Sequence, residues 1–332
     1  MKHSNISIFV PHIGCPHRCS FCDQNTISGA QHLPDGDEVR SICSRALAEA
    51  KSPADTEIAF FGGSFTAIPR EYMLELLTAA SEFVGEGRFR GIRCSTRPDC
   101  ISHEVLDLLE EYGVTAIELG AQSMDDEVLR ANERGHTAQD VMDACALIKE
   151  HGFELGLQMM TGLYLSSPEK DMATAEAVKA LAPATVRIYP VVVLENTALA
   201  ELYRSGKYRM TPFDDMTQLC ADMIRLFTEA GIRVIKCGLH ASEFVERDMV
   251  AGYYHPAFRE ICESLIYRDA IAAQLRESGI TGGSVTVAVN DRCISKAAGQ
   301  SRSNIVYFGE MGISIRISGD SSIPVYGCSI KG

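Results

Sequence analysis

The stretch CPHRCSFC (residues 15–22) places three cysteines within eight residues, soon after the apolar run ISIFV (residues 6–10). Cys15, Cys19 and Cys22 are close enough along the chain to hold one metal centre, because thiolates from a single short loop can reach the same ions. In parallel α/β folds, functional sites gather where strands end. The stretch therefore predicts a metal site after the first strand of an α/β fold.

Two kinds of metal centre suit this loop. A cubane iron–sulfur cluster is usually held by four cysteines, so three would leave one iron open to a further ligand, as catalytic metal sites do. The alternative is a zinc ion held by the three cysteines together with His12 or His17. Zinc sites usually have a second ligand pair roughly 12–20 residues further on. Because the sequence has no second C-x2-C pair, the iron–sulfur cluster is favoured.

Apolar runs alternate with amphipathic segments up to about residue 200. Six runs have the nearly continuous apolar character of parallel strands that are covered on both faces. They are ISIFV (6–10), EIAFFGG (57–63), GIRCSTR (91–97), TAIELG (115–120), FELGLQMM (153–160) and TVRIYPVVV (185–193). The segments between them have helical periodicity, and TAQDVMDACALIKEHG (137–152) begins at a plausible Thr137 cap. Six strand–helix units in series predict an α/β fold, a partial (β/α)6 TIM-type barrel.

The rest of the chain has a different character. A helical segment (213–231) and the strand-like IRVIKCGL (232–239) are followed by a helical stretch near 257–278. Three Gly- and Ser-rich runs then predict strands: GSVTVAV (283–289), SNIVYF (303–308) and ISIRIS (313–318). We therefore expect a core at residues 1–248 and a small carboxy-terminal α+β extension at residues 249–332.

The charge balance limits the partners of this protein. The chain of 332 residues has 44 acidic and 31 basic residues, a net charge of −13. A broad basic surface is not expected from this balance, and DNA is not an expected partner. The sequence shows no signal peptide and no run of about 18 apolar residues, so no membrane association is expected. Twelve cysteines without a secretory leader indicate a reducing compartment, and we expect a cytoplasmic protein.

The spacing C-x3-C-x2-C after a first strand resembles the radical S-adenosylmethionine (SAM) superfamily, and later stretches are similar to it as well. These stretches are AFFGGSFT (59–66), STRPD (95–99), ELGAQSMDDEVL (118–129), NERGHT (132–137) and GLQMMTGLY (156–164). The sequences of these stretches are most similar to the radical SAM core of the elongator catalytic subunit. AGYYHPAFREICES (251–264) resembles the carboxy-terminal radical SAM extension of that group. The oxygen-independent coproporphyrinogen dehydrogenases are more distantly similar.

The resemblance implies an enzyme with two cofactors, a [4Fe–4S] cluster and SAM. Cys15, Cys19 and Cys22 would hold the cluster, and SAM would bind its open iron. Reductive cleavage of SAM would then give a 5′-deoxyadenosyl radical that abstracts hydrogen from a substrate, with the cofactors supplying the difficult chemistry. An electron donor such as flavodoxin or ferredoxin is an implied partner.

The resemblance also implies which residues contact SAM. The glycine pair Gly62 and Gly63 would approach its amino group through the backbone, Gln122 would contact the ribose, and Arg134 would pair with the carboxylate. The full implied set is Phe21, Gly62, Gly63, Ser64, Phe65, Thr66, Ser95, Gln122, Arg134, Gln158 and Met160. Simpler roles are the alternatives: a core position for Phe21, a plain strand-to-helix turn at the glycines, and a surface charge for Arg134.

Substrate-facing and catalytic residues are harder to assign. Tyr189, Tyr253 and His255 are substrate candidates, with plain packing as the alternative, and no catalytic residue is assigned. Glu118 is expected to hold a basic neighbour rather than to act in catalysis. The sequence departs from its relatives at Ser95, where the porphyrinogen branch has a glutamate. It departs again at GLYLSSPEK (162–170), where relatives continue Gly-Leu-Pro-Gly.

Three hypotheses for the function remain open. The first is a radical SAM enzyme that acts on tRNA, by analogy with the elongator subunit. We expect the acetyltransferase domain and the amino-terminal RNA-binding extension of that subunit to be missing, because 14 residues precede Cys15 and the sequence ends at Gly332. The second hypothesis is a radical SAM enzyme with a small-metabolite substrate, which fits the acidic balance. The third is a non-catalytic iron–sulfur or zinc binding module.

Overall fold

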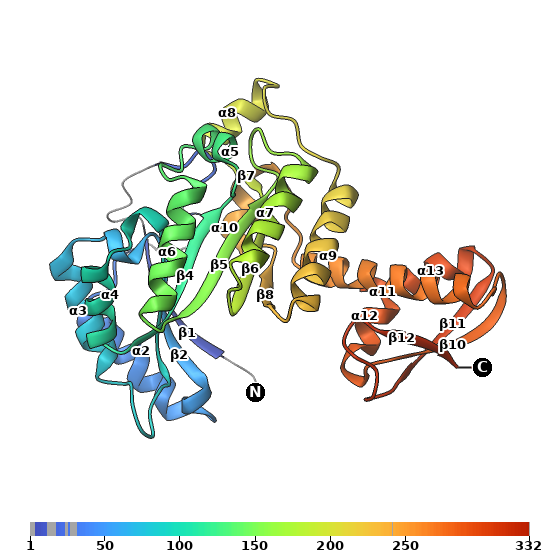
Figure 1. The fold of residues 1–332 in the computed structure, drawn as a ribbon, viewed down its shortest axis with the longest axis horizontal. Coiled ribbons are helices and arrows are strands. Elements are labelled where there is room, and N and C mark those ends of the chain that lie inside the picture. Colours follow the sequence, from blue (N-terminus) through green and yellow to red (C-terminus); the bar gives the residue numbers. More distant parts are fainter. Residues whose placement is uncertain (1–3, 12–17, 24–25, 27–31, 241, 332) are drawn as a thin grey trace. The chain divides into compact units, whose positions relative to one another are not determined.

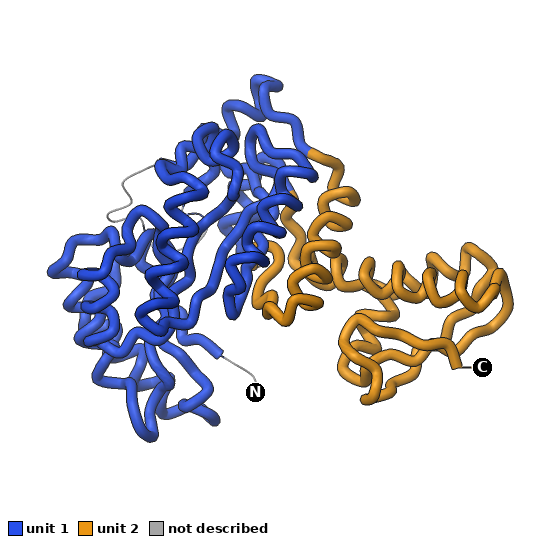
Figure 2. The backbone as a smooth tube through the Cα atoms, viewed as in Figure 1, with its two compact units in different colours: residues 1–210, 241–252 blue, residues 211–240, 253–332 orange. Residues whose placement is uncertain are grey.

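The chain forms two compact units. The computed structural model describes residues 4–11, 18–23, 26, 32–240 and 242–331. Unit 1 consists of residues 1–210 and 241–252, and unit 2 of residues 211–240 and 253–332 (Figure 2). The boundary that we expect near residue 249 stays a prediction. Among the described helices, none is both long and apolar enough to cross a membrane.

Unit 1 is built on a parallel sheet whose strands β1 to β6 follow one another in sequence order (Figure 1). These strands are β1 Ser4–Val10, β2 Thr56–Gly62, β3 Gly91–Thr96, β4 Val114–Gln122, β5 Glu154–Thr161 and β6 Thr185–Pro190. The connecting helices are α2 Gly36–Glu49, α3 Arg70–Ser81, α4 His103–Glu111, α5 Asp126–Ala131, α6 Ala138–Glu150 and α7 Pro168–Ala180. Each neighbouring pair of these strands is parallel, and the sheet curls into the partial barrel that the sequence predicts.

Local sequence explains most of the element boundaries. Helix α6 begins at the predicted Thr137 cap, where Thr137 and Asp140 form a reciprocal capping box. The run TVRIYPVVV, predicted as one strand, is divided in the structure. β6 ends at Pro190, which has no N–H to donate to a ladder. Val192–Leu194 then forms β7, which pairs antiparallel with β9 (Met249–Gly252). Unit 1 also contains α8 (Ala198–Arg204) and α10 (Glu243–Asp248).

A buried network of charged side chains crosses the sheet of unit 1. Arg93 on β3 contacts Glu57 on β2 at 2.7 Å, Glu118 on β4 at 3.0 Å and Glu154 on β5 at 2.7 Å. Arg187 on β6 contacts the second oxygen of Glu118 at 3.0 Å. Glu57, Arg93 and Glu118 are almost completely buried, so each charge depends on its partners. The expectation that Glu118 holds a basic neighbour is confirmed.

Unit 2 contains α9 (Phe213–Glu229), β8 (Arg233–Cys237) and the long helix α11 (Phe258–Glu277). Its carboxy-terminal part has the elements β10 Gly283–Val289, α12 Ile294–Ala298, α13 Ser303–Glu310, β11 Ile313–Gly319 and β12 Cys328–Lys331. Strand β10 lies between β11, which is parallel to it, and β12, which is antiparallel.

The prediction of a strand at SNIVYF (303–308) is wrong. These residues lie in helix α13, where the buried side chains are Asn304 and Phe308, four residues apart and thus on one helical face. Tertiary packing therefore outweighs the β-propensity of isoleucine, valine and tyrosine in this run.

Candidate active site

The cysteine loop is described from Arg18 onward, so Cys15 lies outside the described residues. Cys19 and Cys22 stand on a tight turn in which the Cys22 N–H donates to the Cys19 carbonyl at 3.1 Å. Cys19 is buried and Cys22 is half-buried. Phe21 lies between them and is buried as well. In the part of the chain that the structure describes, no group of three His, Cys, Asp or Glu side chains is placed to hold a metal ion.

Arg134 reaches the cysteine loop from the segment that follows α5. Its Nη1 donates to the Cys19 Sγ at 3.2 Å, and its Nη2 donates to the carbonyl of Gly120, near the end of β4, at 2.8 Å. The side chain is 6% exposed, and its buried Nε has no hydrogen-bond partner among the described residues. The buried guanidinium is thus a charged donor to the Cys19 sulfur. It can also bind an anionic ligand.

Asn132 ties the same segment to the cysteine loop. The Ser20 N–H donates to the Asn132 carbonyl at 3.1 Å, and the Ser20 hydroxyl donates to Asn132 Oδ1 at 2.8 Å. The Asn132 amide donates in turn to the carbonyl of Val128 in α5 and to that of Tyr164 after β5. Because Asn132 is fully buried, these four bonds hold the cysteine loop, α5 and the β5 loop together.

The end of β4 is irregular where it meets Arg134. The pairing of β4 with β5 shifts register between Gly120 and Gln122, and Gln122 has a left-handed φ of 64°. The Gln122 Oε1 is buried without a partner among the described residues. A Cβ atom on Gly120 would lie 2.9 Å from the Gln122 amide and 3.5 Å from the Arg134 guanidinium. Glycine at this position therefore leaves room for both polar side chains.

The glycine pair lies at the end of β2. Gly62 has a φ of 119°, and a Cβ atom there would lie 2.7 Å from the Val10 carbonyl oxygen. The Gly63 N–H donates to the same carbonyl at 3.0 Å. Only glycine allows this backbone conformation and this close approach to β1. The two ends of β1 and β2 are thus held together directly before the cysteine loop.

The three residues after the glycine pair are occupied by packing contacts. The Ser64 and Thr66 hydroxyls both bond to the Thr96 hydroxyl, and Thr66 also donates to the Cys100 carbonyl at 2.8 Å. The Phe65 ring stacks on Phe60 with centroids 4.6 Å apart. These side chains join the ends of β2 and β3. The backbone of residues 64–66 is therefore the part of this turn that is available to a ligand.

Ser95 and Gln158 meet across β4. The Gln158 amide donates to the Ser95 hydroxyl at 3.2 Å, and both side chains are half-buried. Met160 lies two residues beyond Gln158 on β5 and is half-buried too, in register with Tyr189 on β6. Burial raises the pKa of the Tyr189 phenol, so that side chain is neutral at ordinary pH. Ser95, Gln122, Arg134 and Gln158 all come from the same edge of the sheet as the cysteine loop.

The remaining substrate candidates lie in unit 2. Tyr253 is buried, and its hydroxyl donates to the Thr211 carbonyl at 2.8 Å. The His255 Nδ1 accepts a hydrogen bond from the Ala257 N–H at 2.9 Å, at the start of α11. Both side chains therefore make structural contacts within unit 2, and their role toward a substrate stays a prediction.

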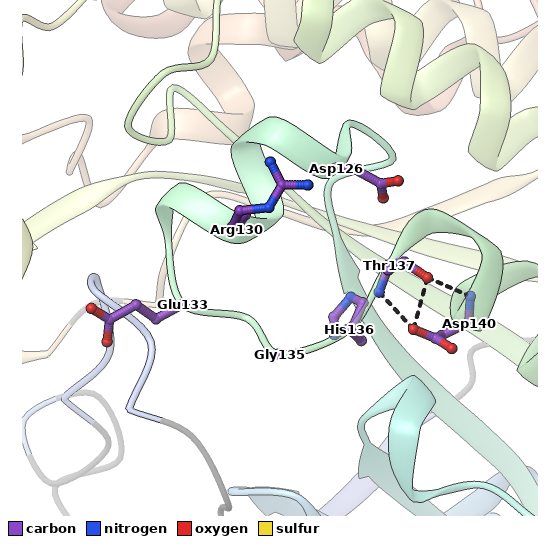
Figure 3. A pocket seen from close by; sticks show the side chains of 7 residues that line it. All are labelled: Asp126, Arg130, Glu133, Gly135, His136, Thr137 and Asp140. Carbon is purple, nitrogen blue, oxygen red and sulfur yellow. Dashed lines mark hydrogen bonds between the residues drawn. The ribbon is translucent and has the colours of Figure 1, made fainter.

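A pocket of about 480 Å³ lies between α5 and the start of α6 (Figure 3). It is lined by Asp126, Arg130, Glu133, Gly135, His136, Thr137 and Asp140. His136 is buried, and its Nε2 hydrogen-bonds to the Ala121 carbonyl at 3.2 Å. Burial and the neighbouring Arg134 charge lower the pKa of His136 to about 4, so the imidazole is neutral and its Nε2 carries the proton. Arg134 and His136 together hold successive carbonyls at the end of β4.

Sequence reasoning missed Asn132, His136 and the Glu57–Arg93 pair. Asn132 and His136 both lie in the segment NERGHT (132–137). Their partners in the cysteine loop and β4 are distant in sequence, so the segment alone did not indicate these contacts. The charged network had a readable signal, because Glu57, Arg93 and Glu118 are charged residues inside otherwise apolar strands. Such residues must find partners when they are buried.

The fold and these contacts define an α/β partial-barrel protein with a polar site at the carboxyl ends of its strands, beside a cysteine loop. Comparison with known families agrees: residues 9–178 match the radical SAM superfamily, and residues 183–268 match the Radical_SAM C-terminal domain. The chain belongs to the radical SAM superfamily. Enzymes of this superfamily use a [4Fe–4S] cluster and SAM and require a reductant, so the chain is a radical SAM enzyme.

Two of the curated relatives are longer proteins. The chain is 27% identical to the tRNA uridine(34) acetyltransferase of Dehalococcoides mccartyi over 253 residues, which cover 66% of this chain and 55% of the relative. It is 31% identical to human Elongator complex protein 3 over 191 residues, 51% of this chain and 35% of the relative. The chain thus spans about half or less of these proteins.

A solved structure confirms the fold. The archaeal Methanocaldococcus infernus Elp3 with an amino-terminal deletion superposes with a TM-score of 0.56 at 19% sequence identity, covering 74% of this chain and 61% of that one. This likeness supports the partial barrel.

Proposed function

We propose that this enzyme reductively cleaves SAM at a [4Fe–4S] cluster held by Cys15, Cys19 and Cys22, and that the resulting radical abstracts hydrogen from a tRNA. The observation that carries the site assignment is the placement of Arg134, whose buried guanidinium joins the Cys19 sulfur to the end of β4. A zinc-binding module would not need a buried arginine, a buried unpaired amide and a close-packed glycine pair around one cysteine loop.

The unsatisfied polar atoms fit SAM. Arg134 Nε and Gln122 Oε1 are buried without partners among the described residues, and such groups are costly unless a ligand or water bonds to them. The guanidinium suits a carboxylate, and the amide oxygen suits a ribose hydroxyl or an amino group. When bound, the cluster and SAM supply the electron and the deoxyadenosyl radical.

The chain's own residues would bind and orient these groups. Arg134 would hold the SAM carboxylate while it donates to the Cys19 sulfur. The backbone of Gly63 and Ser64 would face the amino group, with Phe65 and Thr66 supporting that turn. Ser95, Gln122 and Gln158 would form the ribose side, and Phe21 and Met160 would pack near the adenine. Tyr189, one strand further along the sheet, would face the substrate.

The support for tRNA comes from the relatives. A tRNA uridine(34) acetyltransferase and Elongator complex protein 3 share this region with the chain. A flavodoxin or ferredoxin would supply the electron. The acidic net charge of −13 favours a small-metabolite substrate as the second candidate, because a phosphate backbone would be repelled by most of the surface.

The first experiment tests SAM cleavage. The chain is reconstituted anaerobically with iron and sulfide, and 5′-deoxyadenosine is measured after SAM and dithionite are added. A Cys19→Ala variant should lose both the cluster absorbance and the product. Cys145→Ala, which removes a buried thiol from α6, is the matched control and should retain both. Zinc in place of iron, or a cluster that never cleaves SAM under any condition, would refute the proposal.

The second experiment tests the substrate. Bulk tRNA from the same reconstituted reaction is digested and its nucleosides are compared with those from a reaction without SAM. A new nucleoside that depends on SAM and on Cys19 would support tRNA. Deoxyadenosine formation that tRNA leaves unchanged, but that a metabolite extract stimulates, would instead favour the small-metabolite candidate.

A further inference from the structure

The carboxy-terminal part of unit 2 has a core of its own. Eleven side chains are buried together there: Tyr267, Ile271, Leu275, Val285, Val287, Val289, Cys293, Ala297, Phe308, Ile313 and Ile315. They come from α11, β10, the turn before α12, α12, α13 and β11. We call residues 283–319 the βααβ module, because they run through β10, α12, α13 and β11 in that order. Its two strands are adjacent and parallel over their whole length, from Gly283–Ile313 to Val289–Gly319.

The two helices of the module are joined by a tight four-residue loop, Gly299-Gln300-Ser301-Arg302. Three of the four residues have left-handed φ angles: 87° at Gly299, 52° at Ser301 and 63° at Arg302. A Cβ atom on Gly299 would lie 2.4 Å from the Ser303 hydroxyl and 2.6 Å from the Asn304 nitrogen, so only glycine fits there. Gly299 itself is buried and its N–H donates to the Lys296 carbonyl at 3.1 Å, so the exposed part of the loop is residues 300–302.

Buried contacts hold this loop in place. The buried Asn304 amide donates to the carbonyls of Ser264 and Ala297 at 2.8 and 3.0 Å. The Gln300 N–H donates to the Ser264 hydroxyl at 2.8 Å. The side chains of Gln300, Ser301 and Arg302 are nevertheless exposed. These hydrogen bonds therefore hold the loop backbone in one conformation, and the polar and basic side chains of the loop face solvent.

Basic residues outnumber acidic ones in the βααβ module, and one of them, Lys296, is paired with the buried Glu263 at 2.8 Å. The βααβ module has four basic and two acidic residues, whereas the complete sequence has a net charge of −13. Arg292 lies just before α12 and Arg302 just after it, and neither makes an ion pair with a described residue. Between them Ile294 is 41% exposed and lies beside the end of β11, next to Gly319. The Asp291 carboxylate also lies against Gly319. An exposed isoleucine between two exposed guanidinium groups suits a base and its adjoining phosphates.

We infer that the βααβ module binds a short single-stranded RNA segment, with phosphates on the 299–302 loop and bases against α12 and β11. KH modules bind RNA through a loop at the same place: a tetrapeptide of the form GXXG between two helices clamps about four backbone nucleotides. In this chain Arg302 occupies the place of the second glycine, adding a cation where a phosphate would lie. The inference does not rest on the proposed radical chemistry, because none of these residues belongs to the cysteine site.

The test uses the full chain and a fluorescein-labelled pool of random single-stranded RNAs of about 12 nucleotides, longer than the stretch that such a loop clamps. Fluorescence anisotropy should show binding that weakens with rising salt. The double variant Gln300→Asp, Ser301→Asp should weaken binding at least about tenfold, because like charges oppose the phosphates. Both positions are exposed, and aspartate tolerates left-handed φ, so the fold is retained.

Two further variants separate a binding effect from a structural one. Thr281→Asp with Ser284→Asp adds the same charge at exposed positions at the other end of β10, and should leave the affinity within about twofold. Arg302→Gly relieves a left-handed residue and should not lower stability. It should nevertheless weaken RNA binding and reduce the salt slope by about 0.7, one phosphate contact.

The outcomes decide between the alternatives. No binding by the unmodified chain, equal weakening by both double variants, or tighter binding of a double-stranded RNA of the same length would overturn the inference. Deoxyadenosine formation without added RNA should be the same in all variants. A chain that binds RNA through the loop but never cleaves SAM would therefore refute the proposed function and leave this inference standing.

Discussion

Substituting Gly62 by alanine tests whether the close approach of β2 to β1 is needed for the site. The residue has a φ of 119°, and an added Cβ would lie 2.7 Å from the Val10 carbonyl oxygen and 3.1 Å from its carbon. A left-handed or extended positive φ costs a non-glycine residue about 1–3 kcal/mol. The clash with backbone atoms must add to this, because neither strand end can move without breaking ladder bonds.

A second glycine provides a matched control that separates the cost of a positive φ from the cost of a steric clash. Gly85 has a φ of 129°, but nothing lies within 4 Å of the position that its Cβ would take. Gly85→Ala should therefore cost only the conformational penalty of about 1–3 kcal/mol. Gly62→Ala should cost about 2 kcal/mol more, the middle of the usual range for forcing atoms into a packed interior.

Urea unfolding followed by far-ultraviolet circular dichroism measures both variants. We expect the transition midpoint of Gly62→Ala to fall clearly below that of Gly85→Ala with an unchanged slope. Iron content after reconstitution should fall for Gly62→Ala only, since the cysteine loop begins directly after Val10. Equal midpoints for the two variants would refute the reasoning, because they would show that the contact between the strand ends is not a constraint.

Three more predictions concern buried ionisable side chains. Arg134→Lys keeps one charge but loses the planar set of donors, so SAM affinity should fall about tenfold, while Arg130→Lys on the exposed side of α5 should leave it within about twofold. The pKa of His136 is lowered to about 4 in the folded protein, whereas the unfolded imidazole has a pKa of about 6.5. The unfolded state therefore binds a proton first as the pH falls from about 6.5 to 4, and the free energy of unfolding should decrease by up to about 3 kcal/mol over this range. His136→Gln should remove this dependence in urea titrations at several pH values. Glu118→Gln should cost about 3–5 kcal/mol in the same assay, since it leaves two buried guanidinium groups short of a carboxylate, whereas the exposed Glu104→Gln should cost under about 1 kcal/mol.

Each of these predictions has a contrary result. Equal SAM affinity of the two lysine variants would remove Arg134 from the cofactor site. A pH dependence that survives His136→Gln would place the titrating group elsewhere. A Glu118→Gln variant as stable as the parent would show that water, rather than the carboxylate, satisfies the buried guanidinium groups.

The sequence alone predicted the parallel barrel because each strand is a nearly continuous apolar run. The run EIAFFGG corresponds to β2, and GSVTVAV coincides with β10. Thr137 was recognisable as a cap because the side chain–backbone contact is local. Such features depend on neighbours within four residues, which a sequence displays directly.

Features that depend on distant partners were not readable in the same way. The segment SNIVYF has the composition of a strand, but it forms a helix. This helix depends on the hydrogen bonds from the Asn304 amide to the carbonyls of Ser264 and Ala297. The break after Pro190 depends on β9, some sixty residues later in the chain. The resemblance indicated Arg134 as a functional residue, but its bond to Cys19 connects residues 115 positions apart.

The core of the βααβ module and α11 has a further consequence for how this protein is made and how it can change. All eleven of its buried members lie between residues 267 and 315, one uninterrupted stretch of chain. Assembly of this core requires only short loop closures, so it can form as soon as that stretch has left the ribosome. A stretch that contains its own core can also be copied, lost or joined to another gene as a single cassette.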